Sequence, residues 1–122
     1  MSPRSEDPSA LLPLKSTDFL ILLMLARGER HGYRIMQDVA EHTEGKLTLE
    51  AGSLYRTIRR LQDDRLIEES SRRPAADLDD ERRRYYRLTT FGKRVVGAEA
   101  ARLRALVRIA EAARLLAPLP AH

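Results

Sequence analysis

The chain lacks cysteine altogether, and it has no tryptophan and only two phenylalanines among its 122 residues. Without thiols it can form neither a disulfide framework nor a thiolate metal site or nucleophile. Its three histidines, His31, His42 and His122, show no ligand spacing with one another or with carboxylates. We therefore expect no metal and no cofactor. The absence of a Ser/His/Asp grouping and of a glycine-rich phosphate loop likewise argues against an enzyme.

Long apolar runs and a leader are also missing. The longest apolar run, Phe19 to Ala26, falls well short of the roughly 20 residues that span a bilayer. The first ten residues, MSPRSEDPSA, carry acids and prolines where a signal peptide would need an apolar core. These features predict a cytoplasmic protein that is not anchored in a membrane.

What the chain does contain is enough apolar material for one domain. It is 43% hydrophobic, and its length allows one real core but not two independent ones. Its formal net charge of +4 suits nucleic acid or an anionic surface, although so mild an excess decides nothing alone.

The hydrophobic pattern predicts three helices in the first half of the chain. They run from Ser16 or Thr17 to Gly28, from His31 to about Thr43, and from about Ala51 to Asp64. The first has the interior FLILLMLA, which is apolar nearly all round. Such a helix requires burial from several sides, as between a domain core and a second subunit. The third has Leu54, Ile58 and Leu61 at helical spacing, so one of its faces belongs to the core.

A hairpin and a long helix follow. Leu66, Ile67 and the next residues read as one short strand, and residues 82–88, RRRYYRL, read as another. The polar segment between them contains Pro74 and is too long for a tight turn, which predicts a mobile hairpin tip. From Thr89 or Thr90 a helix should run to about Leu116, where Pro118 and Pro120 follow.

This order of elements predicts a mainly α fold with a small β-hairpin. Helices joined by short connections and followed by a hairpin are typical of a winged helix-turn-helix, whose third helix enters a DNA groove with one face. Arginine supplies donors for guanine edges and phosphate oxygens, and Ser53 near the helix start could meet phosphate. Arg59 and Arg60 diverge by about 100° around the axis, so at most one lies at the centre of the groove face.

A single arginine on an amphipathic helix more often belongs to a solvent-exposed face than to a binding site. The hairpin arginines Arg82 to Arg84 favour DNA, because they place a second cationic element where a wing would touch the backbone. Nearby acids, Asp63, Asp64 and those in residues 77–81, nearly balance this charge, so we expect specific, moderate binding that depends on dimer geometry. An alternative function is a winged-helix module that binds an acidic protein and no DNA. A small hydrolase is a third candidate function, but the chain lacks a catalytic group of residues for it.

Three blocks of sequence resemble the signature blocks of the PadR family of bacterial transcriptional regulators. They are HGYRIMQDV at 31–39, AGSLYRTIRRLQDDRLI at 51–67 and RRRYYRLTTFGKR at 82–94. The resemblance covers roughly residues 15–96, in the right order and spacing. It implies a winged helix-turn-helix with a C-terminal dimerisation helix, DNA binding that is usually repressive, and no enzyme activity.

The resemblance also implies roles for particular residues. It puts Tyr33 against the DNA backbone at the start of the second helix, and it makes Arg84 the wing residue nearest phosphate. Two positions depart from the family pattern: Arg56 stands where proline is frequent, and Arg65 where glycine usually turns the third helix into the wing. A non-glycine residue in a left-handed cap is uncommon, so either the turn is reshaped or Arg65 is strained. Together, residue chemistry and resemblance predict as DNA-binding residues Tyr33, Ser53, Tyr55, Arg56, Arg59, Arg60, Arg83 and Arg84.

The last helix carries a broad apolar stripe that a domain of this size cannot cover alone. We therefore predict a homodimer whose two heads, roughly 34 Å apart, read an inverted repeat in double-stranded DNA. The predicted dimer interface consists of Leu103, Leu106, Val107, Ala110 and Ala113. The predicted division is a loose N-terminal tail over residues 1–13, the DNA-binding domain over 14–88 and the dimerisation helix over 89–117.

Members of the PadR family commonly sense small molecules in or near the dimer interface. Since the chain has no tryptophan, a drug site between two indole rings is excluded. A pocket lined by Phe19, Leu23 and the last helix is left open as an effector site. The function predicted from the sequence is therefore a sequence-specific transcriptional repressor, with release by a small-molecule effector left open.

Overall fold

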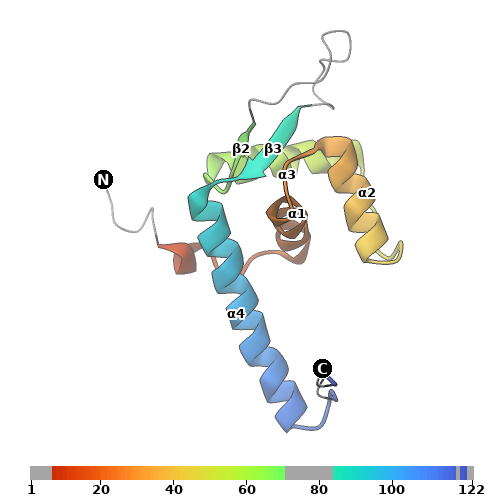
Figure 1. Ribbon diagram of the computed structural model, residues 1–122, viewed down its shortest axis with the longest axis vertical. Coiled ribbons are helices and arrows are strands. Elements are labelled where there is room, and N and C mark those ends of the chain that lie inside the picture. Colours follow the sequence, from red (N-terminus) through yellow and green to blue (C-terminus); the bar gives the residue numbers. More distant parts are fainter. Residues whose placement is uncertain (1–6, 71–83, 118, 121–122) are drawn as a thin grey trace.

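The computed structural model describes residues 7–70, 84–117 and 119–120. Its helices and strands follow the predicted order, with two short elements added, and the last helix leaves the domain as a long arm (Figure 1). This architecture confirms the predicted fold class. In chain order the elements are η2 (Pro8–Leu11), α1 (Ser16–Ala26), β1 (Arg30–His31), α2 (Gly32–His42), α3 (Ala51–Asp63), β2 (Ile67–Glu69), β3 (Tyr85–Leu88) and α4 (Thr90–Ala112).

The sheet has three antiparallel strands in the order β1-β3-β2. Ile67 pairs with Leu88 between β2 and β3, and Arg30 pairs with Tyr86 between β1 and β3. The two-residue strand β1 was not predicted, because its residues read only as the approach to the second helix. It ties the start of α2 directly to the wing. The expected hairpin tip, with Pro74, lies outside the described residues.

The core forms around α1, which contacts α2, β3 and α4. Four of its apolar side chains are buried, whereas Phe19 and Leu23 are only partly buried. Across from it, the predicted core face of α3 is confirmed, since Leu54, Ile58 and Leu61 are almost fully buried. The first helix therefore has the burial that its composition requires on most of its circumference. None of the described helices is both long and apolar enough to cross a membrane.

A left-handed cap turns α3 into β2. Arg65 has φ +62°, its N–H donates to the Gln62 carbonyl at 2.9 Å, and the Leu66 N–H donates to the Leu61 carbonyl at 3.0 Å. These two bonds form a Schellman motif, which ordinarily has glycine at the left-handed position. Of the two alternatives that the sequence left open, a reshaped turn or an arginine in the left-handed cap, the structure has the second. The same bond pattern and a left-handed residue, Glu44 and Arg114 respectively, end α2 and α4.

The start of α4 is locked onto that turn. The Thr89 side chain caps the helix by accepting from the Gly92 N–H at 2.9 Å, and its hydroxyl donates to the Arg65 carbonyl at 2.7 Å. The Thr89 N–H donates to the Leu66 carbonyl at 3.0 Å. Gly92 lies so close to this carbonyl that a Cβ atom there would be 2.0 Å from the Leu66 oxygen. The glycine is required by this close approach of helix to turn.

The N-terminal segment is not loose from residue 8 onward. η2 packs against α4, and the Leu14 N–H donates to the Glu99 carboxylate at 2.9 Å. Glu99 is charged, yet it is only 1% exposed, because the returning segment covers this part of α4. Residues 1–6 lie outside the described residues.

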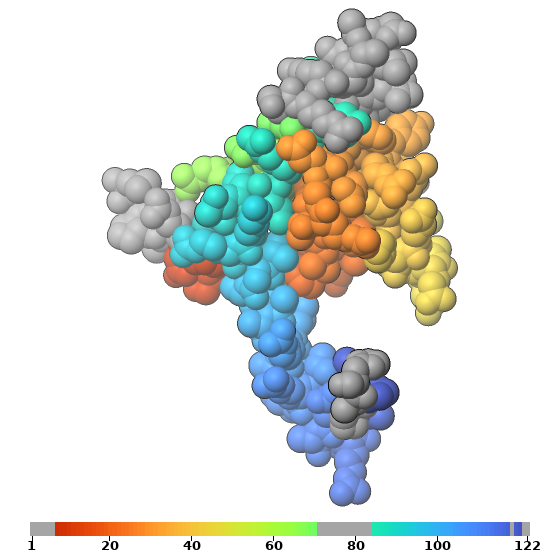
Figure 2. Space-filling model, viewed as in Figure 1, coloured from red at the N-terminus to blue at the C-terminus, as the bar shows by residue number. Residues whose placement is uncertain are grey.

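Two expectations about α4 have different outcomes. The helix ends at Ala112, four residues before the predicted Leu116, because the left-handed Arg114 closes it. Its C-terminal half does project from the body of the molecule, as Figure 2 shows in blue.

Candidate nucleic-acid interface

The face of α3 that turns away from the core carries two exposed arginines one turn apart, Arg56 and Arg59. The Arg56 guanidinium donates to the Ser53 hydroxyl at 3.3 Å, and both side chains lie at the surface near the helix start. Arg59 makes no hydrogen bond or ion pair with any residue of the described ranges. A guanidinium with five donors and no partner among the described residues is suited to bind guanine edges or phosphate oxygens.

The start of α2 lies beside this face. His31 caps the helix, because its Nδ1 accepts from the Arg34 N–H at 3.1 Å. The neighbouring side chain, Tyr33, is 45% exposed. The His31 ring meets the Tyr85 ring of β3 edge to face, at 5.4 Å between centroids. His31 therefore lies at the start of α2, where the hydrophobic pattern placed the beginning of the second helix, and its ring also contacts the wing.

Tyr55 is placed differently from what the sequence suggested. Its hydroxyl oxygen is buried, and the side chain packs so tightly on the start of α2 that a Cβ on Gly32 would be 2.3 Å from the hydroxyl oxygen and 2.7 Å from the nearest ring carbon. The side chain therefore joins α2 to α3 rather than presenting its hydroxyl at the surface. The same contact explains the glycine before Tyr33, since no larger residue fits beneath the ring.

Arg60 is held by the protein itself. Its guanidinium donates two hydrogen bonds, of 2.7 and 3.0 Å, to the carboxylate of Asp18 on α1. Asp18 is buried, and its hydrogen bond raises the pKa of Arg60 above the ordinary value. A guanidinium fixed in this fork geometry positions α3 against α1, and this leaves it poorly placed to follow a phosphate. Sequence periodicity could not detect this, because it gives no partner for Asp18.

The described part of the wing is braced by ion pairs. Arg84 lies 3.8 Å from the Glu69 carboxylate, and Arg87 reaches Glu68 at 2.9 Å and Glu29 at 3.6 Å. The hydrogen bond that Arg87 donates to the Glu68 carboxylate is the main reason why the pKa of Arg87 is raised. Arg84 is nevertheless about half exposed and lies at the end nearest the hairpin tip. Arg83 lies outside the described residues.

A buried carboxylate that the sequence did not reveal holds β1 to α2. Asp38 is 4% exposed and accepts from Arg30 Nε at 2.8 Å, while Arg34 Nε lies 3.0 Å from its second oxygen. Asp38 and the His31 cap together hold β1 and the first turn of α2, the turn that carries Tyr33.

The predicted dimer stripe lies on the projecting half of α4. It continues the face that the head buries at Gly92, Val95, Val96 and Glu99. Beyond Arg102 that face is no longer covered, so Leu106 is 49% and Val107 42% exposed, and Ala113 is exposed as well. Leu103 and Ala110 are partly buried. The sequence left open an effector pocket lined by Phe19, Leu23 and the last helix. In the structure, the Phe19 and Leu23 side chains of α1 are partly buried.

Among the described residues, no group of three or more histidine, aspartate or glutamate side chains could hold a metal ion. The arrangement that does emerge is a helix face with exposed cations, flanked by an aromatic side chain and a wing.

Comparison with known proteins gives consistent results. A family model described as "Transcriptional regulator PadR-like family" matches residues 21–98. A protein of Lysinibacillus sphaericus, "Uncharacterized protein X", is 31% identical over 77 residues, which are 62% of this chain and 67% of that protein.

Solved structures share the fold. A PadR family regulator from Clostridium difficile R20291 matches with TM-score 0.65 and 23% identity, over 80% of this chain and 96% of that chain. Bacillus subtilis PadR, solved in complex with operator DNA, matches with TM-score 0.60 and 22% identity, over 90% of this chain and 53% of that chain.

Proposed function

The chain belongs to the PadR-like family of transcriptional regulators, and from this premise we propose that it is a homodimeric repressor that binds a specific operator in double-stranded DNA. The observation that carries the proposal is the pair Arg56 and Arg59, exposed on α3 directly opposite its buried face. Because Arg59 has no partner in the described ranges, it gives up no hydrogen bond or ion pair with these residues on binding DNA. It is the residue that we assign to base recognition in the major groove.

The remaining contacts divide between phosphate binding and support. Tyr33 and Ser53 lie at helix starts, where a hydroxyl and the helix amides favour a phosphate. Arg83 and Arg84 would reach the backbone from the wing. Tyr55 and Arg60, by contrast, act within the domain: they fix α3 on α2 and α1 and so set the angle of the recognition helix.

The proposed dimer uses the uncovered half of α4. Leu103, Leu106, Val107, Ala110 and Ala113 would pack against the same stripe of a second copy about a two-fold axis. Residues 14–88 then form the reading head and residues 89–117 the arm that spaces two heads roughly 34 Å apart, which matches an inverted repeat. Bacillus subtilis PadR, which shares the fold, was solved with operator DNA, and this supports DNA as the partner.

Repression follows if the operator overlaps a promoter, because a bound dimer would exclude the polymerase. A small-molecule effector would relieve it by favouring a spacing of the heads that does not fit the operator.

Fluorescence anisotropy with labelled duplexes that tile the region upstream of the gene tests this proposal. We expect one fragment to bind at least about a thousandfold more tightly than a scrambled duplex of equal length, with affinity falling as salt rises. Sedimentation of the same sample at micromolar concentration should give a dimer. Equally weak binding to every fragment, together with binding to an acidic protein partner, would instead support a protein-binding module. A monomer would refute the inverted-repeat model.

A further inference from the structure

Arg34 lies in the first turn of α2, where a cation does not favour the helix. The positive end of the helix dipole lies there, and an arginine four residues before an aspartate is the weaker order for such a pair. The buried carboxylate of Asp38 has another partner as well, because Arg30 Nε donates to it at 2.8 Å from β1. The stability of the helix therefore does not explain the position of Arg34.

The two arginines that share Asp38 differ in their exposure. The Arg30 side chain is 19% exposed, and its Nη1 also donates to the Glu29 carbonyl at 3.1 Å. The Arg34 side chain is 54% exposed, and its Nε lies 3.0 Å from Asp38. No described residue accepts a hydrogen bond from the terminal amino groups of Arg34. These two groups are therefore available to an anion outside the domain.

Arg34 also lines a hollow between α2 and the wing strand β3. The hollow has a volume of about 280 Å³, and its other lining residues are Glu29, Arg30, His31 and Tyr85. Two guanidinium groups thus stand against one carboxylate in the lining, and Arg87 lies 3.6 Å from that carboxylate. Because Tyr33 and the wing flank this hollow, it borders the surface that we assign to DNA.

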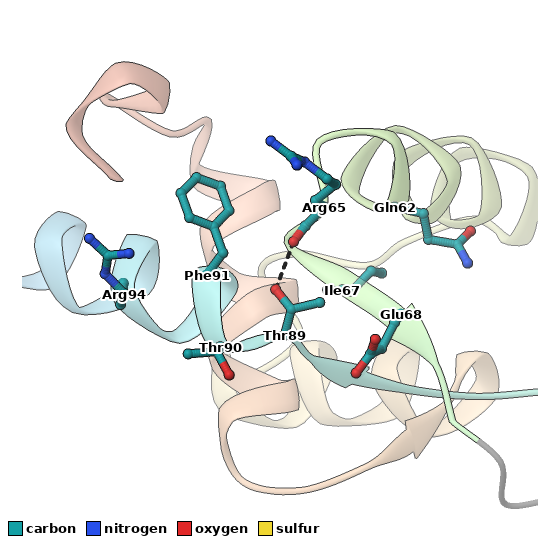
Figure 3. A pocket seen from close by; sticks show the side chains of 8 residues that line it. All are labelled: Gln62, Arg65, Ile67, Glu68, Thr89, Thr90, Phe91 and Arg94. Atoms are coloured by element: carbon teal, nitrogen blue, oxygen red, sulfur yellow. Dashed lines mark hydrogen bonds between the residues drawn. The ribbon is translucent and has the colours of Figure 1, made fainter. Parts of the chain in front are cut away.

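A larger hollow, of about 720 Å³, lies at the C-terminal end of α3 and also contains two arginines. Figure 3 shows the Phe91 ring between the guanidinium groups of Arg65 and Arg94. Beyond Phe91 and Arg65, however, the surface continues into a hollow lined by three carboxylates, those of Asp7, Asp63 and Asp64. A run of phosphates crossing this edge would meet these carboxylates. Of the two hollows, the one at Arg34 is therefore the better place for the DNA backbone.

We propose that Arg34 binds a phosphate of the operator backbone in the hollow between α2 and β3. A guanidinium held at its Nε edge keeps two amino groups that can donate to phosphate oxygens. Such a contact carries no sequence information, so it fixes the head on the duplex while Arg59 reads the bases. This role rests on the proposed function, because it takes DNA as the partner.

The salt dependence of DNA affinity tests this contact. Anisotropy titrations of wild type and Arg34→Gln, with the operator and with the scrambled duplex, give the slope of log affinity against log salt. The loss of one phosphate contact should reduce this slope by about 0.9 for each bound protomer on both duplexes. The preference for operator over scramble should stay within about twofold of wild type, because no base contact is lost. An unchanged slope, or a loss of affinity confined to the operator, would overturn the proposal.

Two further variants serve as controls. Arg34→Lys keeps the charge and should keep the wild-type slope. Arg94→Gln removes an exposed arginine that lines the larger hollow, and it should also keep the slope. An equal fall in slope for Arg94→Gln would reveal an effect of net charge alone, and the proposal would be wrong. Because Arg30 still holds Asp38, both Arg34 variants should fold, which circular dichroism checks. A wild-type chain that binds scramble as tightly as operator would refute the proposed function, whereas the slope on the scramble still tests Arg34.

Discussion

Replacing Gly92 with alanine should destabilise the protein strongly, although alanine is the better helix former. The added Cβ would lie 2.0 Å from the Leu66 carbonyl oxygen and 2.9 Å from the carbonyl carbon. Both are backbone atoms, so no side chain can rotate away. Either α4 or the turn after α3 must move by more than 1 Å to reach ordinary contact, at roughly 3.4 Å or more.

The cost follows from what that movement breaks. Overpacking at a buried site costs about 2 kcal/mol. The Leu66 carbonyl also accepts from the Thr89 N–H at 3.0 Å and from its hydroxyl at 3.2 Å, and losing these bonds costs about 1 kcal/mol each. The higher helix propensity of alanine offsets at most about 1 kcal/mol of this loss. We therefore expect the free energy of unfolding to fall by about 3 kcal/mol.

Gly97, five residues along the same helix, is the matched control. A Cβ there would meet nothing within 4 Å, so Gly97→Ala should raise the free energy of unfolding by up to about 1 kcal/mol. Urea unfolding followed by far-ultraviolet circular dichroism measures both, at one protein concentration because dimer stability depends on concentration. A Gly92→Ala variant within 1 kcal/mol of wild type would refute the close-approach argument.

Three further predictions concern charged residues. Arg65→Gly should raise the free energy of unfolding by about 1 kcal/mol, because it relieves the left-handed arginine; a decrease in urea unfolding would count against strain. Arg60→Met should cost about 2 kcal/mol, since it leaves the buried Asp18 carboxylate unpaired. Adding Asp18→Asn should restore part of that stability, because the buried side chain then carries no charge, and a double variant no more stable than Arg60→Met would contradict this reason. The pKa of Glu99 is lowered, chiefly by two hydrogen bonds from Arg102 and despite burial. Its stabilisation is therefore complete above the unfolded pKa, about 4.3, and is lost as the pH falls through the folded value. Wild type should lose more stability than Glu99→Gln between pH 6 and pH 3, and parallel losses would contradict this.

The elements with strong periodicity could be predicted from the sequence. The core face of α3 follows from Leu54, Ile58 and Leu61 at helical spacing, and the left-handed turn at Arg65 follows from the family pattern around it. The end of α4 was predicted too late, since prolines farther on mark where a helix cannot continue, not where it stops. The two-residue β1 is too short to give any pattern.

The site was predicted only in part, because periodicity gives the direction of a side chain but not its partner. Arg59 and Arg60 are adjacent and chemically identical, yet Asp18 on another helix binds only one of them. Tyr55 turns inward because a glycine on α2 leaves room for its ring. Glu99 is buried because a distant N-terminal segment returns over it. Each of these is a long-range contact that sequence spacing does not encode.

The most direct test of the account is the operator affinity of Arg59→Gln beside that of Arg108→Gln, measured by anisotropy at fixed salt with the scrambled duplex as reference. Both variants remove one exposed arginine, but Arg108 lies on the face of α4 opposite the proposed dimer stripe. If Arg59 reads bases from α3, Arg59→Gln should lose at least about tenfold of the preference for operator over scramble, while Arg108→Gln keeps it. Wild-type preference in Arg59→Gln would contradict the assignment of α3 as the DNA-reading helix.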